Sequence, residues 1–409
     1  MRHAWLWRHR GSFGAIEAGK SPRLLVDVSA IVQKDVHTGI QRVVRAVWSE
    51  LKQRDGQGFT LVPVFATARH GYCQAPHDFL DRVRAPASPM LINVSRGDCF
   101  LGLDLSAHFL PKYRRQIRAW RASGVSVNVV VYDLLPLTHS QWFEKRTVEQ
   151  FREWFETLSW EADQLLCISN QVAVDVAGRL GTMAAPRLIR IRKLNLGADI
   201  AASRPSAGMC LDVTRLLERL RTNDAILMVG TVEPRKAYDV ALAAFEYIWH
   251  TAPQDAPDLV IVGKPGWKTQ ALQVKLRKHL HAGERLHWLP SVSDEGLCRL
   301  YEACKGVLVA SHNEGFGLPL AEALAHGRPV LARDLPVFRE NQSSGIQFFT
   351  QDDPRSLGKR LIELARSASL TDGDIEHRAW SKTVADLLEV LGIKATPTPS
   401  AMPLLRTAS

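Results

Sequence analysis

Residues 305–329 read KGVLVASHNEGFGLPLAEALAHGRP, and this stretch decides the fold class. It begins with an apolar, branched run at 307–310, which is typical of a strand buried on both faces of a parallel sheet. A polar loop then leads to Gly315 and Gly317, and Pro319 stands where it can open a helix. A strand that runs through a glycine-bearing loop into a helix N-terminus is a natural anion site, because free amides and the helix dipole face the ligand.

Two acidic residues flank this loop. Glu314 precedes the glycines, and Glu322 falls in the first turn of the predicted helix. Carboxylates accept hydrogen bonds from hydroxyl groups, while the backbone amides of Phe316, Gly317 and Leu318 can hold a phosphate. The pattern therefore suits a nucleotide joined to a sugar.

The rest of the chain alternates strands with helices. The predicted strands are 24–29, 61–66, 99–103, 125–132 and 164–169 in the first half, and 225–230, 259–263, 285–289, 307–310 and 329–332 in the second. This alternation is typical of an α/β protein with doubly wound parallel sheets. With 409 residues, the chain is too long for one ordinary core, so we expect two domains.

Composition narrows the class of protein. The chain is 46% hydrophobic and 23% charged, as expected of a soluble globular protein, and no apolar run approaches the length of a bilayer span. Six cysteines occur without a Cys-x-x-Cys pair, which favours neither zinc nor disulfides and fits a reducing cytoplasm. The net charge of +10 is compatible with nucleic acid, an anionic membrane surface or a phosphorylated substrate. Because the basic residues are spread along the chain rather than clustered with aromatics, we do not expect nucleic acid.

Further candidate site residues follow other predicted strands. Arg235 and Lys236 lie just beyond the strand that ends at Gly230, where two cations can neutralise a diphosphate. Asp133 stands at the C-terminal edge of the strand 125–132, and Gly39 opens a helix after the first strand. Ligands of open α/β sheets bind at these strand ends, and a glycine permits close approach.

Other motifs argue against competing chemistries. A metal-dependent transferase would want Asp-x-Asp after a buried strand, but the literal match at 372–374 lies in a polar segment that we expect to cap a helix. The Gly-x-Gly at 315–317 lacks the third glycine and the downstream acid of a dinucleotide site, and no Walker lysine motif occurs. His37, His312 and His326 are interpreted as structural or solvated residues.

Several of these motifs together resemble the retaining glycosyltransferases of family four, which have the GT-B fold. The resembling segments are GTVEPRK (230–236), LVIVG (259–263), SDE (293–295) with LY (300–301), and EGFGLPLAE (314–322). This resemblance covers nearly all of residues 222–345. In the first half, TGIQRV (38–43), YDLLP (132–136) and ISN (168–170) look like bacterial enzymes that build mannose- or rhamnose-containing surface polysaccharides, such as lipopolysaccharide O-antigen.

The resemblance implies two Rossmann-like domains that face each other across a cleft. The expected segments are a disordered leader (1–20), an acceptor-side domain (21–205), a linker region (206–221), a nucleotide-sugar-binding domain (222–372), a helix that crosses back to the first domain (373–393) and a disordered tail (394–409).

The resemblance also implies roles for the site residues. Arg235 and Lys236 would stabilise the leaving nucleoside diphosphate without a metal ion or any other cofactor. Glu322 would bind the ribose, and Glu314 would hold the donor sugar or support its positive charge in the transition state. The amides of residues 316–318 would bind the β-phosphate.

The first domain would supply the remaining contacts. Asp133 would contact the sugar or the acceptor, and Gly39 would approach the diphosphate or the acceptor. In the second domain, Gly230 belongs to the motif that carries the two cations and would help to bind the donor. Many family members have His immediately before this Asp, whereas this chain has Tyr132. A usual contact to the donor sugar is therefore missing from the pattern, and His139 does not simply replace it.

The sequence thus predicts a cytoplasmic, metal-independent, retaining hexosyltransferase. We expect it to move a hexosyl group, preferably mannose or rhamnose from a GDP-sugar, to a lipid-linked or growing polysaccharide acceptor. The basic and aromatic residues at 1–10, MRHAWLWRHR, favour peripheral contact with an anionic inner membrane leaflet. Two alternatives remain open: a sugar-phosphate synthase or phosphorylase of the same fold, and a non-catalytic nucleotide-sugar-binding subunit of a polysaccharide assembly complex.

Overall fold

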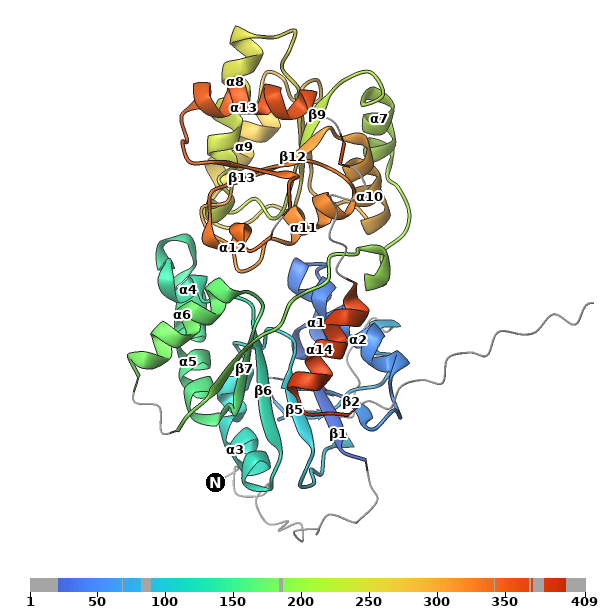
Figure 1. Ribbon diagram of the computed structural model, residues 1–409, viewed down its shortest axis with the longest axis vertical. Helices are drawn as coiled ribbons and strands as arrows, with labels where there is room; N and C mark the ends of the chain where they lie inside the picture. Colours follow the sequence, from blue (N-terminus) through green and yellow to red (C-terminus); the bar gives the residue numbers. More distant parts are fainter. Residues whose placement is uncertain are drawn as a thin grey trace, which may run out of the picture.

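The computed structural model describes residues 21–67, 69–81, 90–183, 187–341, 343–367, 369–370 and 379–394. These form two α/β units stacked along the long axis of the molecule (Figure 1). The predicted leader at 1–20, the Asp-x-Asp at 372–374 and all of the predicted tail except residue 394 lie outside the described residues. No helix in the described part of the chain combines the length and the hydropathy of a bilayer span.

The first unit is built on a sheet of eight described strands in the order β4-β3-β2-β1-β5-β6-β7-β8. The pairs from β2 through β8 are parallel, and the short strands β3 and β4 add an antiparallel edge. The strands are β1 (Arg23–Asp27), β2 (Thr60–Phe65), β3 (Cys73–Gln74), β4 (Met90–Leu91), β5 (Cys99–Gly102), β6 (Ser126–Val131), β7 (Gln164–Cys167) and β8 (Arg190–Lys193).

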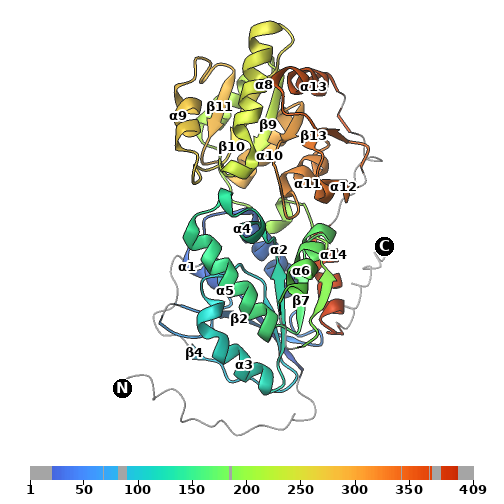
Figure 2. The same cartoon turned by 90° about the vertical axis from the view of Figure 1, so that its left-hand side faces the viewer.

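Helices cover both faces of this sheet, as its apolar central strands require. The helices of the first unit are α1 (Ser29–Gln33), α2 (Gly39–Gln53), α3 (Arg114–Ala122), α4 (Leu135–Thr138), α5 (Lys145–Glu161) and α6 (Asn170–Gly181), with 3₁₀ turns η2 (Phe79–Asp81), η3 (Leu110–Tyr113), η4 (Ser140–Trp142) and η5 (Ala201–Ser203). Helices α3 and α5 lie on one face and α2 on the other (Figure 2).

The second unit is a sheet of six described strands in the order β11-β10-β9-β12-β13-β14, and all its pairs are parallel. The strands are β9 (Ala225–Val229), β10 (Asp258–Val262), β11 (Leu286–Leu289), β12 (Gly306–Val309), β13 (Val330–Arg333) and β14 (Ile346–Phe349). The helical elements are α7 (Leu211–Arg219), η6 (Pro234–Lys236), α8 (Tyr238–Thr251), α9 (Gln270–Lys278), α10 (Asp294–Ala303), α11 (Leu318–Ala325), α12 (Pro336–Arg339) and α13 (Pro354–Arg366). One apolar core lies under α8 and α13, and another lies under α7, α10 and α11.

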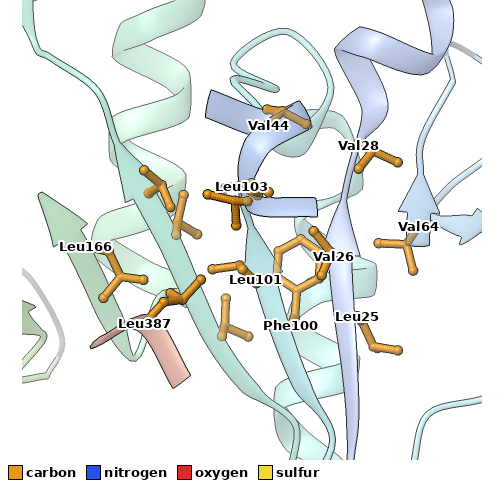
Figure 3. Close-up of a cluster of buried hydrophobic side chains, with 14 of the residues drawn as sticks. Leu25, Val26, Val28, Val44, Val64, Phe100, Leu101, Leu103, Leu166 and Leu387 are labelled. Atoms are coloured by element: carbon orange, nitrogen blue, oxygen red, sulfur yellow. The ribbon is translucent and has the colours of Figure 1, made fainter. Parts of the chain in front are cut away.

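The last described helix, α14 (Trp380–Val390), returns to the first unit and packs beside α2. Its buried side chains join the first core, where Leu387 lies near Leu101 and Leu166 (Figure 3). Gly197 permits this packing, because a Cβ there would lie 2.7 Å from the ring of Trp380.

Three boundaries differ from the sequence predictions. The interval 206–221 is not all linker, because α7 packs Val213 and Leu216 into the second unit. The final helix begins at Trp380 among the described residues, rather than at 373. Helix α11 begins at Leu318, one residue before the proline that the sequence places first.

Contacts between the two units hold them face to face. Lys268 donates to the carbonyls of Gln141 and Phe143 at 2.9 and 2.6 Å, and Trp267 Nε1 donates to the carbonyl of Trp142 at 2.7 Å. On another part of the interface, Glu340 accepts from two backbone amides at the N-terminus of α6. The ends of the strands in the two sheets therefore meet at a single interface.

Candidate active site

The candidate site lies where the strand order of the second sheet reverses. Strand β9 pairs with β10 on one side and with β12 on the other, although β10 and β11 intervene in sequence. Loops after such neighbouring strands leave in opposite directions and open a crevice at the carboxyl edge of the sheet. The loop after β9 carries Arg235 and Lys236, and the loop after β12 carries Glu314, so residues far apart in sequence meet here.

A compact charge cluster occupies this edge. Arg235 Nη1 lies 2.6 Å from Glu314 Oε2, and Lys236 Nζ lies 2.5 Å from Glu314 Oε1. Ser311 Oγ donates to the same Oε1 at 2.8 Å. Arg235 Nε also pairs with Glu233 Oε1 at 2.8 Å. Both cations are thereby fixed in position by carboxylates of their own domain.

Electrostatics decides the protonation state of Glu314. Burial alone would raise the pKa of this carboxyl, but the charges of Arg235 and Lys236 outweigh burial and lower the pKa to about 2. The carboxyl is therefore ionised near neutral pH and can only accept hydrogen bonds. It can hold sugar hydroxyls or stabilise positive charge, and it cannot serve as a proton donor there.

Asp133 of the first unit faces this cluster. It follows β6, and its Oδ1 accepts from the amide of Leu135 at 3.0 Å. Burial raises the pKa of Asp133, against the opposing influence of Arg235, and Glu314 raises it further. The structure thus brings together Arg235, Lys236, Glu314 and Asp133 from the two domains.

At Gly315 the backbones of the two domains approach each other closely. A Cβ at this position would overlap the carbonyl oxygen of Tyr132 and lie 3.1 Å from Cβ of Asp133. The carbonyl of Gly315 also accepts from Ser169 Oγ at 2.7 Å, again across the interface. Only a residue without a side chain allows Glu314 and Asp133 to approach this closely.

The loop then turns into α11 and presents its amides. Gly317 is the N-cap residue at φ 90°, a left-handed conformation that glycine adopts without strain, and a Cβ there would overlap Phe338. No hydrogen bond from the amides of Phe316, Gly317 or Leu318 to another described residue is found. They lie at the positive end of α11, which suits an anionic group.

Glu322 lies one turn into α11 and is almost fully buried, with a side chain 1% exposed. Tyr301 donates to its Oε2 at 2.9 Å, and Arg42 of the first unit forms an ion pair with its Oε1. The other arm of Arg42 binds Asp294 Oδ1 at 2.6 Å. Neither Arg42 nor Asp294 is among the site residues predicted from the sequence, although they lie within the segments TGIQRV and SDE.

The two remaining glycines of the predicted site have different surroundings. Gly39 is the first residue of α2, after the N-cap Thr38, and a Cβ there would lie 3.2 Å from Leu318 Cδ1 across the interface. Gly230 lies under the stem of Lys236, whose Cε would be 3.1 Å from a Cβ. Both positions therefore permit close packing around the loops of the site.

Tyr132 stands where the family pattern has His, and it has a structural role. Its ring is buried and its hydroxyl donates to the carbonyl of Leu103 at 2.8 Å, so it points into the first core rather than toward Glu314. His139 stacks on Trp142, and Trp142 in turn lies 6.0 Å from the ring of His312. His326 packs edge-on against Tyr301. These rings support the interface and the site.

Within the described residues there is no group of three or more His, Cys, Asp or Glu side chains arranged to hold a metal ion. The cations that pair with Glu314 and Glu322 are Arg235, Lys236 and Arg42.

Comparison with known proteins identifies related sequences and folds. Residues 218–379 match the family Glycosyl transferases group 1. The chain is 35% identical over 389 residues to the serotype-specific mannosyltransferase WbdA of Escherichia coli, covering 91% of this chain and 45% of that protein. It is 31% identical over 250 residues to the D-inositol 3-phosphate glycosyltransferase of Salinispora tropica, covering 57% of this chain and 51% of the relative. The chain therefore spans about half the length of the curated relatives it matches.

Solved structures share the two-sheet architecture. Anabaena Alr3699/HepE in complex with UDP and glucose superposes with a TM-score of 0.62 at 14% identity, covering 91% of this chain and all of that one (100%). Sucrose-phosphate synthase of Thermosynechococcus elongatus superposes with a TM-score of 0.56 at 17% identity, covering 91% and 99% of the two chains. At these identities the likeness concerns the fold, which is that of the GT-B glycosyltransferases.

Proposed function

We propose that this chain is a group 1 glycosyl transferase, the family that its residues 218–379 match, and that it transfers a mannosyl group. The proposed donor is GDP-mannose, and the proposed acceptor is a lipid-linked or growing polysaccharide. The observation that carries the proposal is the cluster in which Arg235, Lys236 and Glu314 meet Asp133 between the two domains.

The two cations suit a diphosphate leaving group. Arg235 offers directed hydrogen bonds and Lys236 a compact charge, and together they compensate the negative charge that develops as the glycosidic bond breaks. The amides of residues 316–318 lie at the N-terminus of α11 and can bind the β-phosphate. Because these groups already supply positive charge, we propose that the reaction needs no metal ion.

The carboxylates suit the sugar and the ribose. Glu314, with its pKa of about 2, remains ionised beside the cations and can accept hydrogen bonds from sugar hydroxyls. Glu322 can accept the ribose hydroxyls. We propose retention of the anomeric configuration because EGFGLPLAE resembles the motif of the retaining enzymes.

The choice of mannose and of a polysaccharide acceptor rests on relatives rather than on geometry. The related proteins of Escherichia coli are named serotype-specific mannosyltransferases. Their name supports a mannosyl donor and a cell-surface acceptor for this chain. A lipid-linked acceptor would be met at the inner membrane leaflet, so we also propose that the protein works in the cytoplasm, with peripheral contact at that surface.

Incubation of the purified chain with a panel of sugar nucleotides tests the proposal. GDP-mannose and GDP-rhamnose are compared with UDP-, ADP- and dTDP-sugars, with and without EDTA, by calorimetry, hydrolysis and transfer to lipid-linked saccharides. We expect binding and turnover of GDP-mannose, unchanged by EDTA, with an α-linked product by NMR. Absence of binding, hydrolysis and transfer with every donor refutes the proposal, and turnover only with inorganic phosphate or a small soluble acceptor shows a phosphorylase or a sugar-phosphate synthase instead.

A further inference from the structure

Arg42 connects the first domain to the candidate ribose site of the second. It projects from the first turns of α2, shortly after the Gly39 position, and its side chain is 16% exposed. One guanidinium nitrogen pairs with Glu322 and the other with Asp294, at 2.6 Å in the latter case. Arginine suits this task because its planar fork reaches two carboxylates in a fixed geometry.

Arg42 forms an ion pair with each of the two acids. The side chains of Glu322 and Asp294 are 1% and 10% exposed, so water compensates little of their charge. Burial would raise the pKa of Asp294, but hydrogen bonds from Ser206 and the charge of Arg42 lower it below the usual value. Two buried carboxylates without their cation would be costly, since removal of one partner leaves an uncompensated charge.

Two of the acceptor positions of Glu322 are used by hydrogen bonds from Arg42 and Tyr301. An ionised carboxylate has about four acceptor positions. Tyr301 uses one at Oε2, and Arg42 uses one at Oε1. Two positions remain, which matches the two adjacent hydroxyls of a ribose.

The ion pair between Arg42 and Glu322 also depends on the distance between the two domains. Arg42 lies on the first domain and Glu322 on the second, and Asp294 accepts in addition from the amide and hydroxyl of Ser206, both at 2.9 Å, in the segment that joins the domains. Because a hydrogen bond weakens steeply beyond about 3.5 Å, a separation of the domains by a few ångströms would release Glu322 from Arg42.

We propose that Arg42 is a positioning residue for the ribose of the donor. It holds Glu322 in its accepting orientation from the opposite domain, and ribose recognition is therefore coupled to closure of the two domains. This inference rests on the proposed function, in which Glu322 binds the ribose of a nucleoside diphosphate.

The test compares ribose recognition in matched variants. The affinities of GDP and 2′-deoxy-GDP, and of UDP and 2′-deoxy-UDP, are measured by calorimetry for the wild type, Arg42→Met, Arg42→Lys and Glu322→Gln. We expect the wild type to prefer the ribonucleotide about tenfold, the contribution of one charge-assisted hydrogen bond. Arg42→Met and Glu322→Gln should reduce this preference to within about twofold, and Arg42→Lys, which keeps the charge but loses the fork, should fall between them.

Arg45→Met is the matched control. Arg45 lies on the same helix with a side chain 8% exposed, but it pairs with Asp35 and His37 of its own domain. We expect this variant to keep the ribose preference. If Arg42→Met unfolds, Arg42→Met combined with Asp294→Asn removes one of the two acids and carries the same expectation.

The possible outcomes separate the two proposals. If the wild type binds no nucleoside diphosphate, the proposed function is wrong. If the wild type shows the preference and Glu322→Gln loses it, but Arg42→Met keeps it or binds the ribonucleotide more tightly, then the role of Arg42 is wrong and the proposed function stands.

Discussion

Substitution of Gly315 by alanine should open the interface between the two domains and slow catalysis. The added Cβ would overlap the carbonyl oxygen of Tyr132 and approach Cβ of Asp133 to 3.1 Å. Both atoms directly follow the buried strand β6, so we expect the first domain to adjust little there. Relief therefore requires the domains to separate by about 1 Å.

The expected magnitude follows from this displacement. A shift of about 1 Å at a catalytic site can cost about 100-fold in rate, because reacting groups lose their alignment. The separation moves Glu314 and its cations away from Asp133 while leaving the apolar cores of both domains intact. We therefore expect kcat/KM for the proposed glycosyl transfer to fall about 100-fold, with a change of less than about 1 kcal/mol in the free energy of unfolding.

Steady-state kinetics, denaturant unfolding and small-angle X-ray scattering measure these effects. Gly178→Ala is the matched control, since no atom lies within 4 Å of the position that an added Cβ would take in helix α6. It should stabilise the protein by about 0.5–1 kcal/mol and leave activity unchanged. Activity of Gly315→Ala within threefold of wild type, or a loss of stability above about 3 kcal/mol, would refute the reasoning.

Three further predictions concern charged groups. Lys236→Met should lower kcat/KM for donor turnover by about 100-fold or more. The control is Lys305→Met, which should have no effect because Lys305 is half-exposed and pairs with Asp224. Equal activities of the two variants would show that Lys236 is not part of the site. Burial, followed by the charge of Asp27, raises the pKa of Asp104 to about 7. The folded protein therefore retains a proton that the unfolded chain releases near pH 4, and stability should fall by up to about 4 kcal/mol as pH rises from about 4 to 7. In Asp104→Asn, the free energy of unfolding measured with denaturant should change less with pH over this range. The same pH dependence as in the wild type would contradict the role given to Asp104. Glu340→Ala removes the carboxylate that binds two amides of α6 and Lys193, so scattering should show a more open protein; an unchanged profile would exclude a role for Glu340 in closure.

The second sheet is largely readable from the sequence because most of its strands are short runs dominated by apolar residues. The predicted strands 225–230 and 259–263 agree with β9 (Ala225–Val229) and β10 (Asp258–Val262) to within one residue. No strand was predicted at β14 (Ile346–Phe349), which lies at the sheet edge, is mostly half-buried and carries a polar residue among its apolar ones. An edge position weakens the signal of a buried parallel strand without removing it, because the other edge strand, β11 (Leu286–Leu289), was predicted.

The candidate site is readable only in part, for a related reason. Residues that follow parallel strands lie at the carboxyl edge of the sheet. On this basis the sequence predicted that Arg235, Lys236, Glu314 and Asp133 belong to the site. Contacts such as Arg42 with Glu322 join residues 280 positions apart, and nothing in the local pattern of α2 distinguishes this arginine from its neighbour Arg45. The relative placement of the two domains, which decides such contacts, is a property of the folded chain.

The charge balance at the site leads to a last prediction about product release. Glu314 carries a full negative charge and compensates part of the field of Arg235 and Lys236. An intact sugar nucleotide can place hydroxyl donors against this carboxylate, whereas a free nucleoside diphosphate meets only its repulsion. Glu314 should therefore favour the donor over the product at the same cations.

Glu314→Gln separates these two effects, because it removes the charge and keeps the size of the side chain. We expect the product nucleoside diphosphate to bind about tenfold more tightly, since one nearby like charge is lost, while kcat/KM for the donor falls. Product-inhibition kinetics and calorimetry measure both quantities in the same preparation. Weaker binding of the product would show instead that Glu314 acts mainly by holding Arg235 and Lys236 in place. In that case the substitution frees both cations from their fixed positions, and the product loses their contacts.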